Sequence, residues 1–343
     1  MINSPLTDDV QMDTPVDAPT DNTTSSLTYI PPSVHTEAAL AGDTFTHVVV
    51  PPSLLPSSPD DPSSAVPCCL GVDEAGRGPV LGPMVYGVFF LPLTISDSLL
   101  RDTHHFDDSK VLTAAVRSKL MRTLCTPGSD LHTECGWAIK ALSARDITAG
   151  QLHPTTTYNL NAQALDATVD LIKAAYAAGV NVQEIYVDTV GPPASHQAKL
   201  QRFFPTAKIT VTKKADSLFA CVSAASVCAK VTRDATLEVL SDAKGELTEN
   251  GMAWGSGYSS DKRCTGWMKK NMHPLFGWGN ECRFDWGTSK DMLDKANGVK
   301  VEWPVEDDGE TSRVTDFFTA ADKDKESSEL GNWFGTPAGL EAF

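Results

Sequence analysis

The sequence lacks the features that would place the chain outside the cell or in a membrane. Its 343 residues include eight cysteines, none of them in a Cys-x-x-Cys pair, which is too sparse for a disulfide scaffold. The longest apolar run, Met84–Leu91, is far shorter than a membrane span. Met1–Pro5 carries no basic start before an apolar stretch, so we expect no secretory signal. We therefore expect an intracellular, reducing compartment and no membrane partner.

Basic residues are scarce at both ends of the chain. Residues 1–66 hold nine acidic residues and no Lys or Arg, and residues 291–343 hold thirteen acidic residues against five basic ones. The net charge of −16 therefore belongs to the ends, and residues 67–290 are nearly neutral. Because the Ser-, Thr-, Pro- and Asp-rich stretch 1–66 offers little apolar surface to bury, we predict a disordered N-terminal extension. We predict that 291–343 is an acidic, largely disordered tail.

The middle of the chain alternates between strand and helix patterns. Short apolar runs predict strands at 68–73, 84–91, 184–188 and 208–212, and helical spacing predicts helices at 113–125, 158–178 and 217–240. Such alternation indicates an α/β catalytic domain over 67–250. The Trp-, Gly- and Lys-rich stretch 251–290 is predicted to form a helical C-terminal appendage.

Four carboxylates follow predicted strands: Asp73, Glu74, Asp188 and Asp216. Each alone is compatible with an ordinary turn or a helix start. Two carboxylates 5–8 Å apart repel by roughly 2–3 kcal/mol at an effective dielectric near 20, so a fold that gathers all four needs cations. Hard oxygen ligands favour Mg²⁺ or Mn²⁺. The spacing alone does not establish that the four residues meet.

Asp73 and Glu74 add a constraint, since neighbours on a regular strand point to opposite faces. Both can serve one site only if the chain turns there, and Ala75–Pro79 is predicted to supply that turn. Its glycines allow backbone N–H groups to approach a sugar or phosphate closely. No Gly-Lys-Ser/Thr follows, which excludes a nucleoside-triphosphate loop.

Residues 71–85, Gly-Val-Asp-Glu-Ala-Gly-Arg-Gly-Pro-Val-Leu-Gly-Pro-Met-Val, resemble the signature of the type 2 ribonucleases H, specifically the catalytic A subunit of the eukaryotic enzyme. Further matches follow in the family's order over about 67–290: Asp108-Ser109-Lys110, Tyr158-Asn159-Leu160-Asn161, Val187-Asp188-Thr189-Val190-Gly191, Lys214-Ala215-Asp216, Ser223-Ala224-Ala225-Ser226, Ala229-Lys230 and Gly255-Ser256-Gly257-Tyr258.

The resemblance implies a ribonuclease-H-like mixed sheet flanked by helices. It also implies a metal-dependent endonuclease in which Asp73, Glu74, Asp188 and Asp216 hold two Mg²⁺ or Mn²⁺ ions. Such an enzyme would cleave the RNA strand of RNA/DNA hybrids, and would cut 5′ of single ribonucleotides in duplex DNA, leaving 3′-hydroxyl and 5′-phosphate ends. Roles in ribonucleotide excision repair and Okazaki-primer removal, and a nuclear location, would follow.

The same resemblance implies a set of substrate-binding residues. Gly76, Arg77 and Gly78 would read the 2′-hydroxyl of a ribonucleotide through the backbone, because that hydroxyl distinguishes RNA from DNA. Tyr258 would stack on the neighbouring deoxyribose, although a core tyrosine is the alternative. Lys110 would contact a phosphate, although a solvated residue at a helix start is the alternative.

The resemblance also implies partners, with B and C companion subunits forming a heterotrimer. In the tail, Val314, Phe317 and Phe318 have the spacing of a sliding-clamp-binding peptide, with Thr311 in place of its usual Gln. The alternative is a segment that docks on the core or on one of the companion subunits. Two other functions stay open for the whole chain: a non-catalytic nucleic-acid scaffold, or another nuclease of the same fold.

Overall fold

The computed structural model describes residues 29–58, 61, 64–106, 112–153, 158–189, 191–248 and 251–295. Lys110 and the predicted clamp-binding segment with Val314, Phe317 and Phe318 lie outside the described residues, as do residues 1–28 and the rest of the tail.

A mixed sheet of six strands forms the centre of the fold, in the order β1-β4-β3-β2-β5-β6. The first four strands in this order pair antiparallel, whereas β2 pairs parallel with β5, and β5 parallel with β6. The strands are β1 (Phe45–Val49), β2 (Pro67–Ala75), β3 (Met84–Pro92), β4 (Gly136–Leu142), β5 (Asn181–Asp188) and β6 (Lys208–Thr212).

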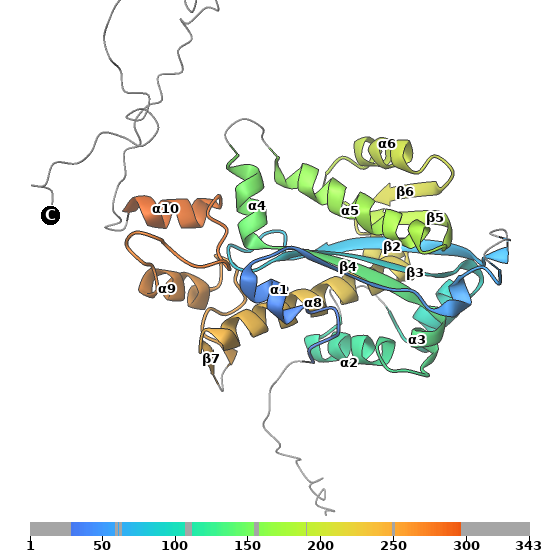
Figure 1. The fold of residues 1–343 in the computed structure, drawn as a ribbon, viewed down its shortest axis with the longest axis horizontal. Helices are drawn as coiled ribbons and strands as arrows, with labels where there is room; N and C mark the ends of the chain where they lie inside the picture. The colour runs from blue at the N-terminus through green and yellow to red at the C-terminus, as the bar shows by residue number, and fades with distance from the viewer. Residues whose placement is uncertain are drawn as a thin grey trace, which may run out of the picture. The chain divides into compact units, whose positions relative to one another are not determined.

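Helices cover both faces of this sheet (Figure 1). On one face, α8 (Ala220–Ala243) packs on the strands together with α1 (Thr36–Ala41) and α2 (Ala114–Leu124). On the other face lie α5 (Leu160–Ala177), α4 (Ala144–Gln151) and α6 (Pro193–Phe203). The predicted mixed α/β sheet flanked by helices is confirmed, and a separate apolar core lies on each face.

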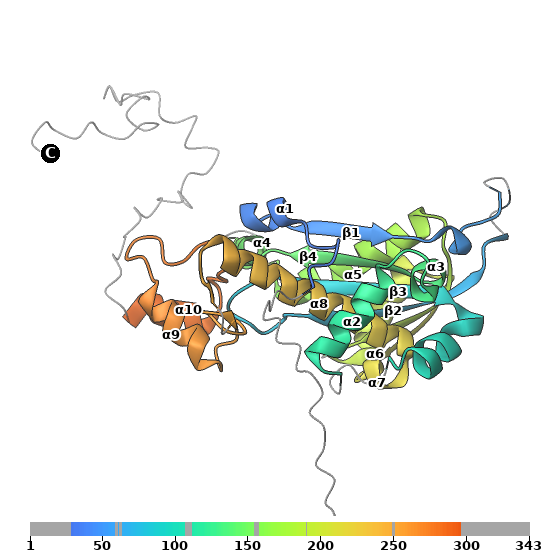
Figure 2. The ribbon, with the colours of Figure 1, turned by 90° about the horizontal axis from the view of Figure 1, so that it is seen from below.

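The central helix α8 packs closely against β2. Figure 2, which views the molecule from below, shows the helix running across the sheet. Its sheet-facing residues are small: Ala, Ser and Cys predominate between Ala220 and Ala229. A Cβ atom on Gly71 of β2 would overlap the backbone of Cys221. Glycine at this position therefore lets the helix backbone approach the strand that carries Asp73 and Glu74.

Shorter elements complete the fold. None of the described helices is long and apolar enough to cross a membrane. The shorter elements are η1 (Pro52–Leu54), η3 (Leu93–Ile95), η4 (Ser98–Thr103), α3 (Asp130–Glu134), α7 (Ala215–Leu218), β7 (Leu247–Thr248), β8 (Gly251–Met252), α9 (Lys262–Lys270) and α10 (Gly287–Lys295).

The predicted helical appendage is present as α9 and α10, and it has a core of its own. Trp254, Trp267 and Trp278 pack there against Leu237 and Leu240 from the end of α8. The same cluster includes Val80 and Leu81, which follow the glycine turn. The small hairpin of β7 and β8 straddles the predicted boundary at residue 250. The appendage is thus packed directly on the loop next to the carboxylate pair.

The prediction that residues 1–66 are disordered is wrong for the part of this stretch that the structure describes. Residues 36–41 form α1, and β1 pairs along its whole length with β4 at the edge of the sheet. The side chain of Phe45 is buried, and the hydroxyl of Ser33 lies 2.7 Å from that of Thr232 on α8. A few buried side chains and a full row of strand hydrogen bonds thus order a segment whose overall composition is polar.

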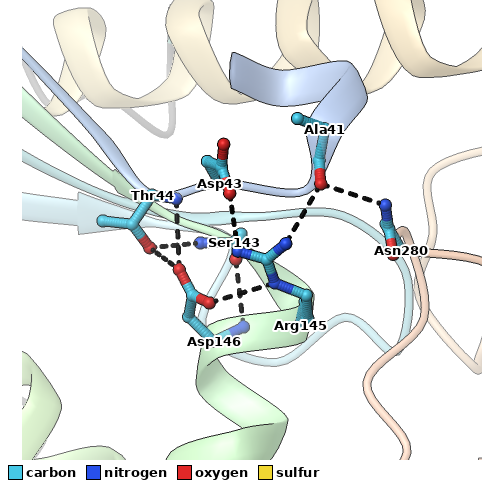
Figure 3. Close-up of polar contacts among 7 residues, drawn as sticks. All are labelled: Ala41, Asp43, Thr44, Ser143, Arg145, Asp146 and Asn280. Atoms are coloured by element: carbon cyan, nitrogen blue, oxygen red, sulfur yellow. Dashed lines mark hydrogen bonds and ion pairs between the residues drawn. The ribbon is translucent and has the colours of Figure 1, made fainter.

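Polar contacts fasten this segment to the start of α4 (Figure 3). The backbone N–H and the hydroxyl of Thr44 both donate to Asp146, at 3.1 and 2.7 Å, and the Thr44 hydroxyl accepts from the N–H of Ser143 at 3.1 Å. Arg145 donates to Asp43 at 2.6 Å and to the carbonyl of Ala41 at 3.2 Å. Thr44 is therefore the centre of the attachment.

We expect Thr44→Val to lower the free energy of unfolding by about 1–2 kcal/mol, because it removes one hydrogen bond to a carboxylate and leaves the Ser143 N–H without its acceptor. The matched control is Thr46→Val, since Thr46 is exposed on β1, two residues later, and should tolerate the change. Urea unfolding of the full chain measures both. Equal effects of the two substitutions would contradict the attachment.

Candidate active site

The four predicted acidic residues lie at one edge of the sheet, where the parallel strands end. Asp73 and Glu74 stand near the end of β2, and Asp188 is the last residue of the neighbouring strand β5. Val72 pairs with Val187, which sets Asp73 and Asp188 side by side in register. Asp216 lies in α7, directly after β6. The carboxyl ends of parallel strands are where α/β sheets place their ligand sites.

Asp73 and Glu74 keep to opposite faces of the sheet, because β2 stays regular through Ala75. The turn predicted at Ala75–Pro79 begins one residue later, at Gly76, and so leaves Asp73 and Glu74 on the regular strand. Asp73 is 7% exposed and faces α8, where it forms a hydrogen bond with Ser226 and feels the charge of Lys230. Glu74 faces the α5 side and lines a cavity there. The site therefore draws its carboxylates from both faces of one strand.

Burial and mutual repulsion raise the pKa of both residues. The pKa of Asp73 is raised chiefly by burial and also by the charge of Asp188, while hydrogen bonds from Ser226 and the N–H of Glu74 oppose the rise. The pKa of Glu74 is raised chiefly by burial, then by Asp73 and also by Asp188, against the charge of Arg77. Asp73, Glu74 and Asp188 are thus close enough for the charge of one carboxylate to raise the pKa of another.

Asp188 is held in place by the chain that follows β6. Its Oδ1 accepts a hydrogen bond of 2.9 Å from the N–H of Ala215, the first residue of α7. Lys214 adopts a left-handed conformation, with φ of 57°, and so turns the chain sharply into this contact. Asp216, which follows Ala215 in α7, is 4% exposed. One backbone hydrogen bond therefore brings the Asp216 segment to the end of β5.

The donor chemistry of this edge fits a hard divalent cation, because its side chains are carboxylates whose burial and repulsion a cation would relieve. Within the described ranges, no three His, Cys, Asp or Glu side chains lie together closely enough to hold a metal ion. A bound ion would have to draw Asp73, Glu74 and Asp188 toward one another.

A cavity of about 180 Å³ adjoins these carboxylates on the α5 side of the sheet. Glu74 and Asp188 line it, together with Arg77 from the glycine turn. The guanidinium of Arg77 donates to Asn161 of α5 at 2.5 Å and to the hydroxyl of Tyr86 at 3.3 Å. Arg77 is thus fixed to α5 and β3 and forms a wall of the cavity.

The glycine turn has a conformation that other residues would strain. Gly76 has a φ of 76°, and a Cβ atom there would lie 2.6 Å from the carbonyl oxygen of Pro83. A side chain at this position would therefore clash with the chain that returns toward β3. The predicted role of Gly76, Arg77 and Gly78 in close backbone approach is compatible with this geometry.

Arg283 of the appendage holds this turn from behind, and sequence reasoning did not identify it. It is fully buried, and its guanidinium donates to the carbonyls of Gly76 at 2.6 Å, Arg77 at 2.9 Å, and Gly82 at 2.9 and 3.1 Å. Burial lowers its pKa to about 9. Arg283 therefore stays charged at neutral pH, and neutral carbonyls satisfy it. Only its position among the tryptophans could have drawn attention to it.

Tyr258 is exposed and lies beside the turn, as predicted. Its side chain is 39% exposed, and a Cβ atom on Gly78 would lie 3.5 Å from its ring. The carbonyl of Gly257 accepts from the N–H groups of Val80 and Leu81 at 3.0 and 3.1 Å, which ties the Tyr258 loop to the chain after the turn. Tyr258 and the glycine turn thus form one surface. Its alternative interpretation as a core tyrosine is wrong.

Comparisons with known proteins identify the family of this chain. The family model described as Ribonuclease HII matches residues 70–289. The A subunit of ribonuclease H2 from Neurospora crassa is 56% identical over 320 residues, which cover 92% of this chain and 97% of the relative. The protein of the same name from Schizosaccharomyces pombe is 45% identical over 317 residues (91% and 90%). That from Homo sapiens is 40% identical over 254 residues (74% and 82%).

Solved structures share the fold. The crystal structure of the ribonuclease H2 from Pyrococcus horikoshii OT3 matches with a TM-score of 0.54 at 29% identity, covering 66% of this chain and 97% of that one. The PCNA:RNase HII complex from Archaeoglobus fulgidus matches with a TM-score of 0.53 at 24% identity, covering 65% and 96%. Together the fold and the family match define the class of the protein, which is an enzyme of the ribonuclease H type.

The chain belongs to the ribonuclease HII family. The predicted resemblance to the type 2 ribonucleases H, as their catalytic subunit, is confirmed.

We expect Glu74→Gln to stabilise the metal-free protein at pH 8 by about 1–3 kcal/mol, because it removes a buried charge. The folded state raises the pKa of Glu74 above its ordinary 4.5. The loss of stability caused by ionised Glu74 is therefore absent below about pH 4.5 and grows as the pH rises. Thermal unfolding in EDTA at pH 5 and pH 8 measures the effect, with exposed Glu37→Gln as the control. A gain that is larger at pH 5 would contradict the assignment.

We expect Arg283→Lys to lower the free energy of unfolding by about 2–4 kcal/mol, because an ammonium cannot reach all three carbonyls and leaves buried acceptors unsatisfied. Ribonuclease activity should fall as well, since the turn loses its support. Arg202→Lys is the control, because Arg202 is exposed on α6. Unchanged stability together with full activity would show that Arg283 does not hold the turn.

Proposed function

We propose that this ribonuclease H is an endonuclease that cleaves the RNA strand of RNA/DNA hybrids and cuts 5′ of single ribonucleotides in duplex DNA. The observation that carries the proposal is the placement of Asp73, Glu74 and Asp188 at the edge of the sheet next to the glycine turn. Phosphodiester cleavage and recognition of a 2′-hydroxyl would thus take place side by side.

Asp73, Glu74, Asp188 and Asp216 are the residues that would hold Mg²⁺ or Mn²⁺, in a site for two ions. When bound, two such ions would lower the pKa of the attacking water and neutralise the leaving 3′ oxygen, giving 3′-hydroxyl and 5′-phosphate ends. Ser226 and the hydrogen bond from Ala215 fix the directions of Asp73 and Asp188. Their role is to orient the two carboxylates before the substrate arrives.

Recognition of the substrate falls to the turn and to Tyr258 in this proposal. The backbone at Gly78 is exposed and would accept a ribose there, while Arg283 holds the buried Gly76 and keeps the turn rigid. The exposed ring of Tyr258 stands next to Gly78 and can stack on the adjoining deoxyribose. Lys110, outside the described residues, would contact a phosphate. The turn selects the ribose and the ring selects the junction with DNA.

The partners and the cellular role belong to the same proposal. The relatives carry the name of an A subunit, which supports B and C companion subunits in a heterotrimer. A solved archaeal relative was captured in complex with PCNA, which supports clamp binding through Val314, Phe317 and Phe318. Ribonucleotide excision repair, primer removal and a nuclear location follow from the substrate.

A duplex with one internal ribonucleotide tests the proposal. The full chain, supplied with companion subunits where needed, should nick it with Mg²⁺ or Mn²⁺ and not in EDTA, and should leave an all-DNA duplex intact. We expect Asp188→Asn to fold normally, because its amide oxygen can still accept from Ala215, yet to lose at least about 100-fold in rate with the ligand charge.

The control for this substitution is Asp242→Asn, which makes the same change at an exposed residue of α8 and should retain full activity. Wild-type turnover by Asp188→Asn would remove the site assignment. Equal cutting of an all-DNA junction would favour another nuclease of the same fold, and binding without any metal-dependent nick would favour a scaffold.

A further inference from the structure

The cavity beside Glu74 and Asp188 has a second wall that the proposed chemistry does not use. This wall is formed by α6, which contributes Ser195, His196 and Lys199. The helix is fixed against the sheet, because Leu200 is buried and Gln197 accepts from the N–H of Val211 on β6 at 3.4 Å. The cavity therefore has acidic residues at the strand ends and basic residues on the helix.

The charges in this cavity are not matched in pairs. Glu74 and Asp188 face Arg77 and Lys199 across it, yet among the described residues none of these four side chains forms an ion pair. Arg77 instead donates to neutral oxygens of Asn161 and Tyr86. The positive charges of Arg77 and Lys199 are thus available to an anion that enters the cavity.

His196 lines the same cavity as these two cations. Its pKa is lowered, first by burial and then by the charges of Lys199 and Arg77, which places all three groups near one another. Its Nδ1 lies 3.4 Å from the hydroxyl of Thr189, the residue after Asp188. Its Nε2 is buried and has no hydrogen-bond partner in the part of the chain that the structure describes. A ligand oxygen in the cavity would supply the missing partner.

We propose that His196 and Lys199 of α6, with Arg77, bind the phosphate of the cleaved strand that adjoins the scissile phosphate. This inference rests on the proposed function, since it assigns the scissile phosphate to the carboxylate edge. A nucleic-acid strand presents consecutive phosphates at short spacing. The cavity has carboxylates that would bind metal ions, and beside them positively charged side chains that would bind the neighbouring phosphate. The α6 wall thereby sets the register of the strand relative to the carboxylates.

Lys199→Gln tests the electrostatic part of the proposal. Binding of a ribonucleotide-containing duplex to the full chain in EDTA should weaken about tenfold, as expected for the loss of a hydrogen bond to a charged group. The slope of log affinity against log salt should fall by about 0.9, because one phosphate contact is lost. Lys119→Gln is the matched control, since Lys119 is exposed on α2 at the opposite face of the sheet. An unchanged slope for Lys199→Gln would overturn the contact.

Neutral methylphosphonate groups, placed one at a time along the ribonucleotide strand, identify the phosphate. A methylphosphonate next to the scissile position should weaken binding to the wild type, and should weaken binding to Lys199→Gln much less, because the contact is already gone. At every other position the two effects should multiply. Multiplication at all positions, or coupling only at the scissile phosphate or beyond its neighbours, would overturn the assignment.

A pair of variants separates the role of His196 from mere packing. His196→Gln keeps an N–H donor and should bind the duplex within about threefold of wild type, whereas His196→Leu should weaken binding about tenfold. Equal binding by both variants would remove His196 from the site. These outcomes are distinct from failure of the proposed function. If the proposed function is wrong, the wild-type chain itself will not distinguish the ribonucleotide-containing duplex from an all-DNA duplex, whatever the variants do.

Discussion

The carboxylate end of the sheet is constrained by the energetic cost of placing two neighbouring carboxylates at the end of one buried strand. Because β2 stays regular, Asp73 and Glu74 face different layers of the molecule. Asp73 is held by α8, and Glu74 opens into the cavity bounded by α5 and α6. Burial opposes the charge of both. The surroundings therefore disfavour that charge, and a bound cation would offset it.

The appendage forms part of the structure around the glycine turn. Arg283 donates hydrogen bonds to the carbonyls of Gly76 and Arg77 in the glycine turn and of Gly82 after it, and Trp286 donates to the carbonyl of Gly78 at 3.0 Å. The loop that carries Tyr258 is tied to Val80 and Leu81. The backbone of the glycine turn near residue 76 is thus shaped by a residue some two hundred positions later. The catalytic domain and the appendage act as one structure around the turn.

The sequence predicted the parts of this site that local patterns carry. The strands that carry Asp73 and Asp188 and the long helices were readable from periodicity, and the motif around Gly76 indicated the family. β4 was missed because its seven residues are few and Lys140 interrupts their apolar pattern. Arg283 was missed because its role arises from tertiary contacts, and β1 because prolines closely bracket its short apolar run.

Strand β1 has a consequence beyond local stability. It covers the outer side of β4, whose backbone groups would otherwise face solvent along a row of buried, largely apolar residues. A bare strand of that kind is a template for pairing with another molecule. Proteolytic clipping between β1 and β2, or trimming the chain to its recognisable catalytic motifs, would therefore produce a species inclined to self-associate through β4 while its carboxylate edge remained intact.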